Sequence, residues 1–432
     1  MRLDEFLDEL ERDKSAERRQ LAADRSYAVT DYLEDFEERF ESVSSGGTAF
    51  GSTAPSIFVG HANYPRVPTG LLSPVGNEAT AADFITDSSW YHQDISIADV
   101  MARRSALLNA NRSYAVSAPA RKSTELPNVA DRWDGFLGVQ REIAIADRPV
   151  DIEVNLAKRP ALTFDVDNIA EPTGPWAKAE NVDLTENPHV PREVDKTLSD
   201  DDWRAEGAMT YLYRRGFDVY DIHRILSAGA LGQSHERQLV PTRWSITAVD
   251  DTIGKLLRGQ LRNAKPLNQV EVWRNEFMGN AYWILLAPGQ WEFELVEIKA
   301  PGSVWNPSHE GSVHIGSDYE SFAGRTAYVE ETAGAYHATR LGVLEHLKER
   351  DRQAKALVIR HVSDEYWGPV GVWQVRESVR NAFTGEPGRA ESFGAAVSEL
   401  LPHLPITGEL LRRSSTLVEA QQTDLRAFQS GM

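Results

Sequence analysis

Three closely spaced apolar segments constrain the fold of this chain more than any other feature. They lie at 269–275, 281–287 and 291–298, and short turns that contain glycine join them. Segments of this length that are rich in aromatic and β-branched residues, with such turns between them, are typical of strands connected as hairpins. The sequence therefore predicts a sheet that is built largely from antiparallel strands.

The remaining predicted elements occur in groups and do not alternate regularly. We expect strands at 57–60, within 144–157, at 355–361 and at 370–377. We expect helices at 97–109, 209–217, 219–228, 378–383 and 392–400, with a long helix that follows 319–325 and ends at 349. Stretches 42–56 and 171–202 lack periodicity, so they are predicted to be a linker and a long loop. This grouping favours an α+β fold, a largely antiparallel sheet with flanking helices.

Three parts follow from these patterns. Residues 1–47 contain 14 acidic and 7 basic residues with apolar residues at helical spacing, which predicts an acidic helical extension. Residues 48–415 form the expected α+β core body, and residues 416–432 form an expected flexible tail. The chain has no cysteine, which excludes disulfides, a cysteine nucleophile and cysteine-ligated zinc or iron–sulfur sites. It has no run of 18 apolar residues and no export leader, so we expect a cytoplasmic protein without a membrane partner.

The charge of the chain indicates the solvent for which it is adapted. It has 65 acidic and 46 basic residues, a net charge of −19, and the basic residues are 36 Arg and only 10 Lys. A surface crowded with carboxylates, on which Arg replaces Lys, is what we expect in a salt-accumulating organism. The acidic total therefore does not argue against a nucleic-acid partner. At molar salt the Debye length is about 3 Å, so phosphate contacts must be close and local.

The last segment of the chain carries three spaced side chains, Gln422, Leu425 and Phe428. They share one side of a helical turn, because helical neighbours recur at three and four residues. The pattern resembles the peptide with which many replication and repair proteins bind the sliding clamp (PCNA), a helix-in-groove mode of docking. That peptide often has a second aromatic residue where this chain has Gln429. The alternative is that the segment closes the preceding helix and packs on the chain's own body.

A loop in the core body presents residues that could bind nucleic acid or carry chemistry. Glycine and proline force a loop after the strand at 57–60, and that loop contains His61, Tyr64 and Arg66. Loops that leave strand ends are common positions for functional residues. Arg66 is a candidate for phosphate contact, as is Arg325 before the long helix, and His61 is a candidate catalytic residue. A structural role for the loop is the alternative.

A second segment places Arg237 and Arg243 on either side of a Val-Pro step, and Trp244 follows directly. Two arginines and an indole could grip phosphate and stack a base. The alternative is that an arginine pairs with Asp250 or Asp251 at the start of a helix.

The third predicted strand ends in Glu297-Ile298-Lys299, an order that one large nuclease superfamily uses. There the glutamate and an upstream acid hold a divalent metal such as Mg²⁺, and the lysine assists the attacking water. Asp250, Asp251 or Glu276 could supply the second carboxylate. The alternative is a surface ion pair on an edge strand.

The body and the tail together resemble the archaeal Nre family of DNA repair proteins. The likeness rests on 56–60 with 64–66, on 240–250 and on the terminal Gln-x-x-Leu-x-x-Phe, and it covers roughly residues 55 to 429. It implies a part in the repair of damaged DNA, with the sliding clamp as partner through Gln422, Leu425 and Phe428. Many relatives also carry an amino-terminal four-cysteine zinc motif, which this chain lacks.

Two hypotheses follow from these patterns, and the resemblance leaves catalysis open. The first is a repair factor without a resident cofactor that the clamp delivers to DNA, where it acts directly or with other repair proteins. The second is a metal-dependent nuclease, or another nucleic-acid enzyme, that uses Glu297 and Lys299. No P-loop, serine hydrolase elbow, zinc protease signature or full dinucleotide fingerprint is present.

Overall fold

The computed structural model describes residues 27–43, 47–76, 81–118, 135–307 and 311–420. These residues divide into two compact units, Ser26–Ile253 and a second unit that begins at Gly254. We call them the amino-terminal unit and the carboxyl-terminal unit, and helix α10 (Thr242–Leu261) continues from one into the other. Among the described helices, none has the length and apolar character that a membrane crossing requires.

The amino-terminal unit is built on a six-stranded sheet with the strand order β1-β5-β6-β4-β3-β2. All neighbouring strands run antiparallel except β4 and β6. Buried and half-buried residues alternate along β5, as the two-residue period of a strand with one covered face requires. The strands are β1 Thr48–Thr53, β2 Ile57–Val59, β3 Arg66–Pro74, β4 Leu107–Ala115, β5 Val150–Leu156 and β6 Trp176–Leu184.

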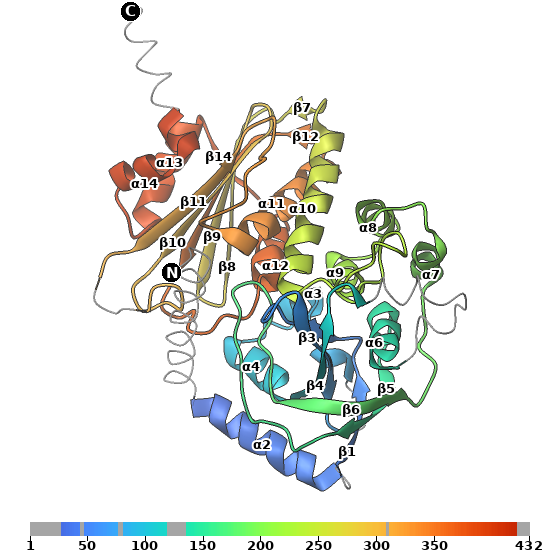
Figure 1. The fold of residues 1–432 in the computed structure, drawn as a ribbon. Helices are drawn as coiled ribbons and strands as arrows, with labels where there is room; N and C mark the ends of the chain where they lie inside the picture. Colours follow the sequence, from blue (N-terminus) through green and yellow to red (C-terminus); the bar gives the residue numbers. More distant parts are fainter. Residues whose placement is uncertain (1–26, 44–46, 77–80, 119–134, 308–310, 421–432) are drawn as a thin grey trace, which may run out of the picture. The chain divides into compact units, whose positions relative to one another are not determined.

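Helices pack on this sheet and on one another (Figure 1). Helix α6 packs on β6, α9 packs on α6 and β2, and α2 packs on β1 and α4. Apolar side chains from α2, α6 and the strands form one buried core. The helices are α2 Tyr27–Val43, α3 Ser88–His92, α4 Ile97–Ser105, α6 Gly135–Ile145, α7 Arg192–Ser199, α8 Ala205–Arg214 and α9 Val219–Ser227, with the 3-10 turn η1 Ala81–Phe84.

The carboxyl-terminal unit contains a second six-stranded sheet, with the order β11-β10-β13-β9-β8-β14. Strands β10 and β13 are parallel, and the other neighbours are antiparallel. The strands are β8 Val270–Phe277, β9 Asn280–Ala287, β10 Glu292–Lys299, β11 His314–Glu320, β13 Lys355–Val362 and β14 Gly388–Ala390, and a separate parallel pair joins β7 Lys265–Pro266 and β12 Arg352–Gln353.

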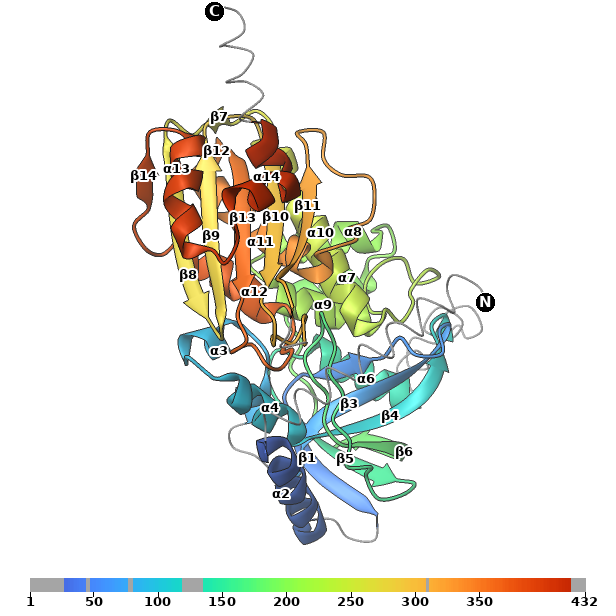
Figure 2. The same cartoon turned by 90° about the vertical axis from the view of Figure 1, so that its left-hand side faces the viewer.

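Helices cover both faces of the second sheet, which gives this unit three layers (Figures 1 and 2). Helices α11 and α12 lie on one face, and α13 and α14 lie on the other. Because both faces are covered, the central strands β10 and β13 are buried along almost their whole length. The helices are α11 Ala333–Glu349, α12 Trp373–Ala382, α13 Phe393–Leu400 and α14 Gly408–Ser414, with the 3-10 turn η3 Leu401–His403.

The predicted α+β class, with largely antiparallel sheets and flanking helices, is confirmed. The first predicted hairpin is also confirmed, because β8 and β9 pair through a two-residue turn at Met278 and Gly279. Both turn residues have positive φ angles, 48° and 67°. Two-residue hairpin turns of this kind match the right-handed twist of the flanking strands. A Cβ atom added at Gly279 would also lie only 2.8 Å from the backbone nitrogen of Tyr366, which is too close for a real contact.

The second predicted hairpin is wrong. Strand β10 follows β9 after a short glycine turn, but β13 lies between them in the sheet. β13 pairs with β9 on one side and with β10 on the other. A turn signal in the sequence shows only that the chain bends, and a strand from a distant part of the chain can still insert at that point.

Five further predictions need correction. The linker expected at 42–56 contains β1, and the loop expected at 171–202 contains β6 and α7. The strand expected at 370–377 is the beginning of α12, and the long helix begins only at Ala333. The helix expected at 97–109 ends at Ser105, and β4 follows it. Each error lies where tertiary packing overrides a weak local preference.

Candidate nucleic-acid interface

The start of α10 is fixed to the end of strand β2 in the amino-terminal unit. The backbone N–H of Val59 donates to the buried side-chain oxygen of Thr242 at 2.9 Å. The backbone N–H groups of Trp244 and Ser245 both donate to the carbonyl of Pro241, at 2.8 and 2.9 Å, and begin the helix. This anchoring places Arg243 and Trp244 beside the loop that follows β2.

That loop, residues 60–66, is closed by its own backbone. The N–H of Tyr64 donates to the carbonyl of His61 at 3.3 Å, and the N–H of Arg66 donates to the carbonyl of Asn63 at 2.9 Å. Asn63 has a positive φ of 62°, a conformation that asparagine tolerates better than most residues. The base of the loop is tied by the N–H of Gly60, which donates to the carbonyl of Pro68 at 2.8 Å. The loop is therefore a defined turn.

The loop and the helix start bring two exposed aromatic rings together. The Tyr64 and Trp244 ring centroids are 5.3 Å apart, and their planes meet at 62°. Tyr64 is 54% exposed and Trp244 is 42% exposed. Arg66 is also exposed, and one of its guanidinium nitrogens donates to the carbonyl of Ser113 at 3.1 Å. The result is an aromatic surface with a cation on the same loop.

Arg243 connects the same loop to a carboxylate. One of its terminal nitrogens lies 3.4 Å from Asp167 and 3.5 Å from the imidazole of His61. Asp167 is held in turn, because its other oxygen accepts from the N–H groups of Ile169 and Ala170. The positive charge of Arg243 is therefore partly balanced at this surface. Asp167 and Thr242 were not among the residues predicted at this site: Asp167 lies in no pattern that the sequence analysis used, and Thr242 belongs to the 240–250 segment without having been given a role.

Two of the arginines that were predicted to contact phosphate bind groups of the protein itself. Arg237 is buried and donates to the carbonyls of Gly232 and Leu198 at 2.9 and 2.8 Å. Arg325 lies in the carboxyl-terminal unit, where it pairs with Asp318 at 2.9 Å and donates to three backbone carbonyls. The structure thus brings together His61, Tyr64, Arg66, Arg243 and Trp244. Arg237 and Arg325 are each held by contacts of their own.

Glu297 and Lys299 share one face of β10, as predicted, and form an ion pair at 3.1 Å. Glu297 is also paired with Arg360 at 2.6 Å and is buried. Burial alone would raise the pKa of Glu297, but Lys299 and Arg360 outweigh burial and hold the pKa below its usual value. Because β10 lies between β11 and β13, the alternative of a surface ion pair on an edge strand is wrong.

Two of the other acidic candidates lie on different elements, Asp250 on α10 and Glu276 on β8. Asp250 is buried on α10 in the amino-terminal unit, and Glu276 is exposed and pairs with Arg274 at 2.8 Å. In the part of the chain that the structure describes, no group of three or more histidine or acidic residues could hold a metal ion. Two cations already balance Glu297, which favours a structural role for the Glu297–Lys299 pair.

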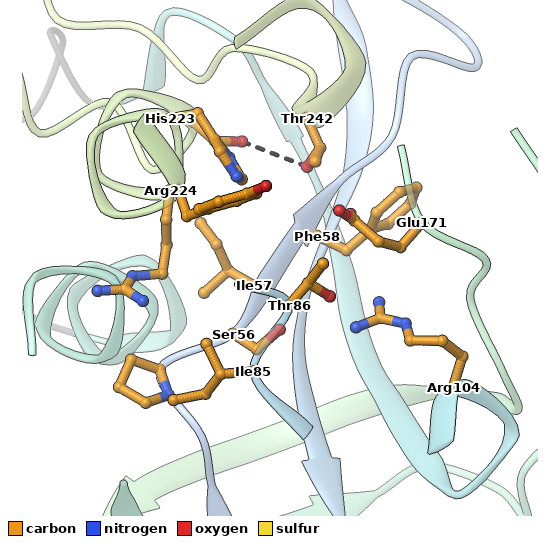
Figure 3. Close-up of a pocket in the computed structure, with 13 residues that line it drawn as sticks. Ser56, Ile57, Phe58, Ile85, Thr86, Arg104, Glu171, His223, Arg224 and Thr242 are labelled. Carbon is orange, nitrogen blue, oxygen red and sulfur yellow. Dashed lines mark hydrogen bonds between the residues drawn. The ribbon is translucent and has the colours of Figure 1, made fainter. Parts of the chain in front are cut away.

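A small pocket in the amino-terminal unit is lined by residues of β2, α9 and the start of α10, among others (Figure 3). Its volume is about 50 Å³, which is room for a few water molecules and not for a nucleotide base. The Thr86 hydroxyl is buried there and has no hydrogen-bond partner among the described residues. Burial lowers the pKa of Arg104, and Glu171 opposes that shift. In Figure 3 Arg104, Thr86 and His223 point toward the pocket, whereas Arg224 points away from it.

The docking residues Gln422, Leu425 and Phe428 lie outside the described residues. Of the expected tail at 416–432, residues 416–420 are helical and anchored to β10. The carboxylate of Glu294 accepts from the hydroxyl of Ser415 at 2.7 Å and from the N–H groups of Thr416 and Leu417 at 2.7 and 2.9 Å. The docking residues therefore begin two positions after an anchored helical turn.

Matches to known protein families cover nearly the whole chain. The family model for archaeal Nre, N-terminal, matches residues 21–306, and the model for archaeal Nre, C-terminal, matches residues 320–428. Neither match ends at the boundary between the two compact units, which lies at Gly254. No solved structure matches the chain.

The similar proteins are all named as DNA repair proteins. DNA repair protein NreA of Haloferax volcanii is 60% identical over 99% of this chain and 100% of its own length. DNA repair protein NreA of Archaeoglobus fulgidus is 36% identical over 80% of this chain and 82% of its own length. DNA repair protein NreB of the same organism is 32% identical over 88% of this chain and 91% of its own length. The chain therefore belongs to the archaeal Nre family.

Proposed function

We propose that this protein is a DNA repair factor that the sliding clamp recruits through Gln422, Leu425 and Phe428. The repair role is supported by relatives of similar length that carry the name DNA repair protein. Recruitment by the clamp is supported by one observation, the spacing of an amide, an aliphatic and an aromatic residue near the carboxyl terminus. DNA, the clamp and other repair proteins are the partners in this proposal, and the acidic, Arg-rich composition suits a salt-rich cytoplasm.

The energetics of such a contact suit a recruited factor. Burial of Leu425 and Phe428 in an apolar pocket contributes roughly 1.5–3 kcal/mol each. Ordering a segment on binding costs about 2–5 kcal/mol. The difference is small, so the clamp holds the factor weakly and exchanges it readily. Gln429, which stands where a second aromatic is common, lowers the affinity further.

The anchored helical turn supports the same proposal from the structural side. Ser415, Thr416 and Leu417 are all held by Glu294, and Leu417 is buried in the core beneath α13 and α14. A docking peptide works as a tether only if the chain before it is attached firmly to the folded body. Residues 415–417 supply that attachment, and the three docking residues follow it closely.

Calorimetric titration with the sliding clamp tests this proposal. Phe428→Ala and Leu425→Ala should each weaken binding by tenfold or more, because each substitution removes an apolar side chain that fills the pocket. Gln429→Ala is the matched control, since Gln429 belongs to the same segment and is not one of the three docking residues. Binding that is equal in all four proteins would remove the clamp from the proposal. The repair role would then rest on family membership alone.

A further inference from the structure

We propose that Tyr64 and Trp244 form a stacking platform for the unpaired bases of single-stranded DNA. The inference rests on the proposed function only in that DNA is the partner, and it does not depend on the clamp. It assigns a DNA-binding surface to the amino-terminal unit and specifies the form of DNA that this surface binds. The surface consists of Tyr64 and Trp244 together with His61, Arg66 and Arg243, and we call it the aromatic platform.

The rings of the aromatic platform are accessible as a pair. Among the described residues, Tyr64 and Trp244 are the one pair of contacting rings in which both belong to the exposed large hydrophobic side chains. Trp176, which is 42% exposed, contacts no other ring of the same described residues. A large apolar area left in water has an energetic cost, and two such rings side by side mark an interaction surface. Every base has a flat π-face that stacks on an indole or a phenol.

The platform is also formed before its ligand arrives. Trp244 sits in the first turn of a helix that is pinned to β2 by the Val59–Thr242 hydrogen bond. Tyr64 sits in a loop closed by two backbone hydrogen bonds and held at its base by a third. Both backbones are therefore fixed without the ligand. Binding then orders little of the protein, which leaves most of the stacking energy as affinity.

The charges around the rings fit a short stretch of backbone phosphate. Arg66 is exposed on the same loop, and its guanidinium donates one hydrogen bond to the carbonyl of Ser113, which leaves other N–H groups for a ligand. Arg243 is shared with Asp167, so it adds less than a full positive charge. We therefore expect one or two phosphate contacts from these side chains. For single strands the slope of log K against log salt is about −0.7 per phosphate, which predicts a shallow salt dependence.

Stacking on the rings of the aromatic platform favours single strands over duplex DNA. Bases in a duplex are stacked on one another, so their faces are not available to an aromatic side chain, whereas those of a single strand are. A protein with net charge −19 and one or two phosphate contacts gains little from the duplex backbone alone. Stacking, by contrast, persists in concentrated salt.

Fluorescence anisotropy with a labelled oligothymidine of about 12 nucleotides tests the proposal on the full chain. Trp244→Ala and Tyr64→Ala should each weaken binding about tenfold, which corresponds to about 1.4 kcal/mol. Trp244→Phe and Tyr64→Phe should retain most of the affinity, because they keep a stacking ring. Trp176→Ala is the matched control, since Trp176 lies in the same unit and has the same exposure as Trp244. Its affinity should not change.

Three results would overturn the proposal. The first is binding of a blunt-ended duplex of two annealed strands with an affinity equal to that of the oligothymidine. The second is a loss in Trp176→Ala as large as the loss in Trp244→Ala. The third is the absence of oligothymidine binding at protein concentrations up to about 100 µM, which would assign the exposed rings to a protein partner. A chain that ends at Ala420 separates this proposal from clamp docking, because it should keep its affinity for the oligothymidine.

Discussion

Two charged regions, one in each compact unit, place arginine in opposite environments. In the carboxyl-terminal unit, arginine and glutamate are buried as pairs, Arg340 with Glu320 at 2.9 Å and Arg360 with Glu297 at 2.6 Å. In the amino-terminal unit, Arg66 and the rings of Tyr64 and Trp244 lie at the surface. The comparison teaches that a pattern of charged residues indicates function only where those residues are not already paired within the fold.

The carboxyl-terminal unit contains several ion pairs with a buried glutamate. Glu320 accepts from the indole N–H of Trp291 as well as from Arg340, and Arg258 lies 3.7 Å from its second oxygen. Glu271 is held by both terminal nitrogens of Arg350. Carboxylates held in this way have their acceptor oxygens occupied within the fold, so they specify a packed core and leave few acceptors for a ligand.

The largest effect is expected when the buried pair of Arg360 and Glu297 in this unit is broken. Arg360→Met leaves Glu297 with Lys299 alone and also removes both hydrogen bonds to Asn280, so it should lower the free energy of unfolding by about 3–5 kcal/mol. Urea denaturation measures this loss. The control is Arg274→Met, because Arg274 forms an exposed pair with Glu276 and should cost at most about 1 kcal/mol. Equal losses in the two variants would break the contrast between buried and exposed charges.

A smaller effect is expected at the anchor of the carboxyl-terminal segment. Glu294→Ala removes the acceptor of three hydrogen bonds at Ser415, Thr416 and Leu417, and should destabilise this helical turn by about 2–3 kcal/mol. Hydrogen exchange at the Thr416 and Leu417 amides should accelerate, while exchange in β9 stays slow. Glu409→Ala, an exposed residue of α14 that pairs with Arg413, is the control and should change neither. Unchanged exchange in Glu294→Ala would show that the anchor lies elsewhere.

Burial in the carboxyl-terminal unit also shifts the pKa of a histidine, His346, so the stability of this unit should depend on pH. Burial, with a contribution from Arg350, lowers the pKa of His346 to about 4, and Glu271 opposes this only in part. The unfolded chain then binds more protons than the folded protein between pH 6.5 and 4, so stability falls as the pH is lowered through that range. His346 stacks on Phe383 with ring centroids 3.9 Å apart.

His346→Phe keeps this stacking and removes the titrating group. The wild-type protein should lose about 1–2 kcal/mol of unfolding free energy between about pH 7 and pH 5 through this residue, and the variant should lose correspondingly less. Burial lowers the pKa of His361 in the same direction, so part of the acid sensitivity remains. Urea denaturation at the two pH values measures these losses of unfolding free energy. Equal losses in the wild type and the variant would exclude His346 as a source of the acid sensitivity.

Local signals in the sequence were sufficient to predict some helices and strands and their pairing, and not others. The β8–β9 hairpin could be predicted because a two-residue turn with Gly279 between two apolar strands favours their direct pairing, and no other strand inserts between them. The place of β13 between β9 and β10 could not, because strand pairing over long separations depends on which buried faces fit. The beginning of α12 at Trp373 was predicted as a strand, since a helix buried on several sides loses its polar face.

The candidate site was predicted in its parts and not in its arrangement. Trp244 was named as a candidate and Tyr64 was only placed in the loop, but the two lie in distant segments, and only the fold shows that their rings touch. Arg237 and Arg243 were given the same role because they flank one Val-Pro step. Their burial differs, since Arg237 is turned inward to two carbonyls while Arg243 reaches the surface loop. No spacing rule distinguishes two such side chains.

One titration tests the central claim that the clamp contact and the DNA contact are separate. A chain that ends at Ala420 is titrated with the sliding clamp and with the oligothymidine under the same conditions. We predict that clamp binding is lost and that oligothymidine binding is unchanged. Clamp binding that survives the truncation at full affinity would contradict this claim directly.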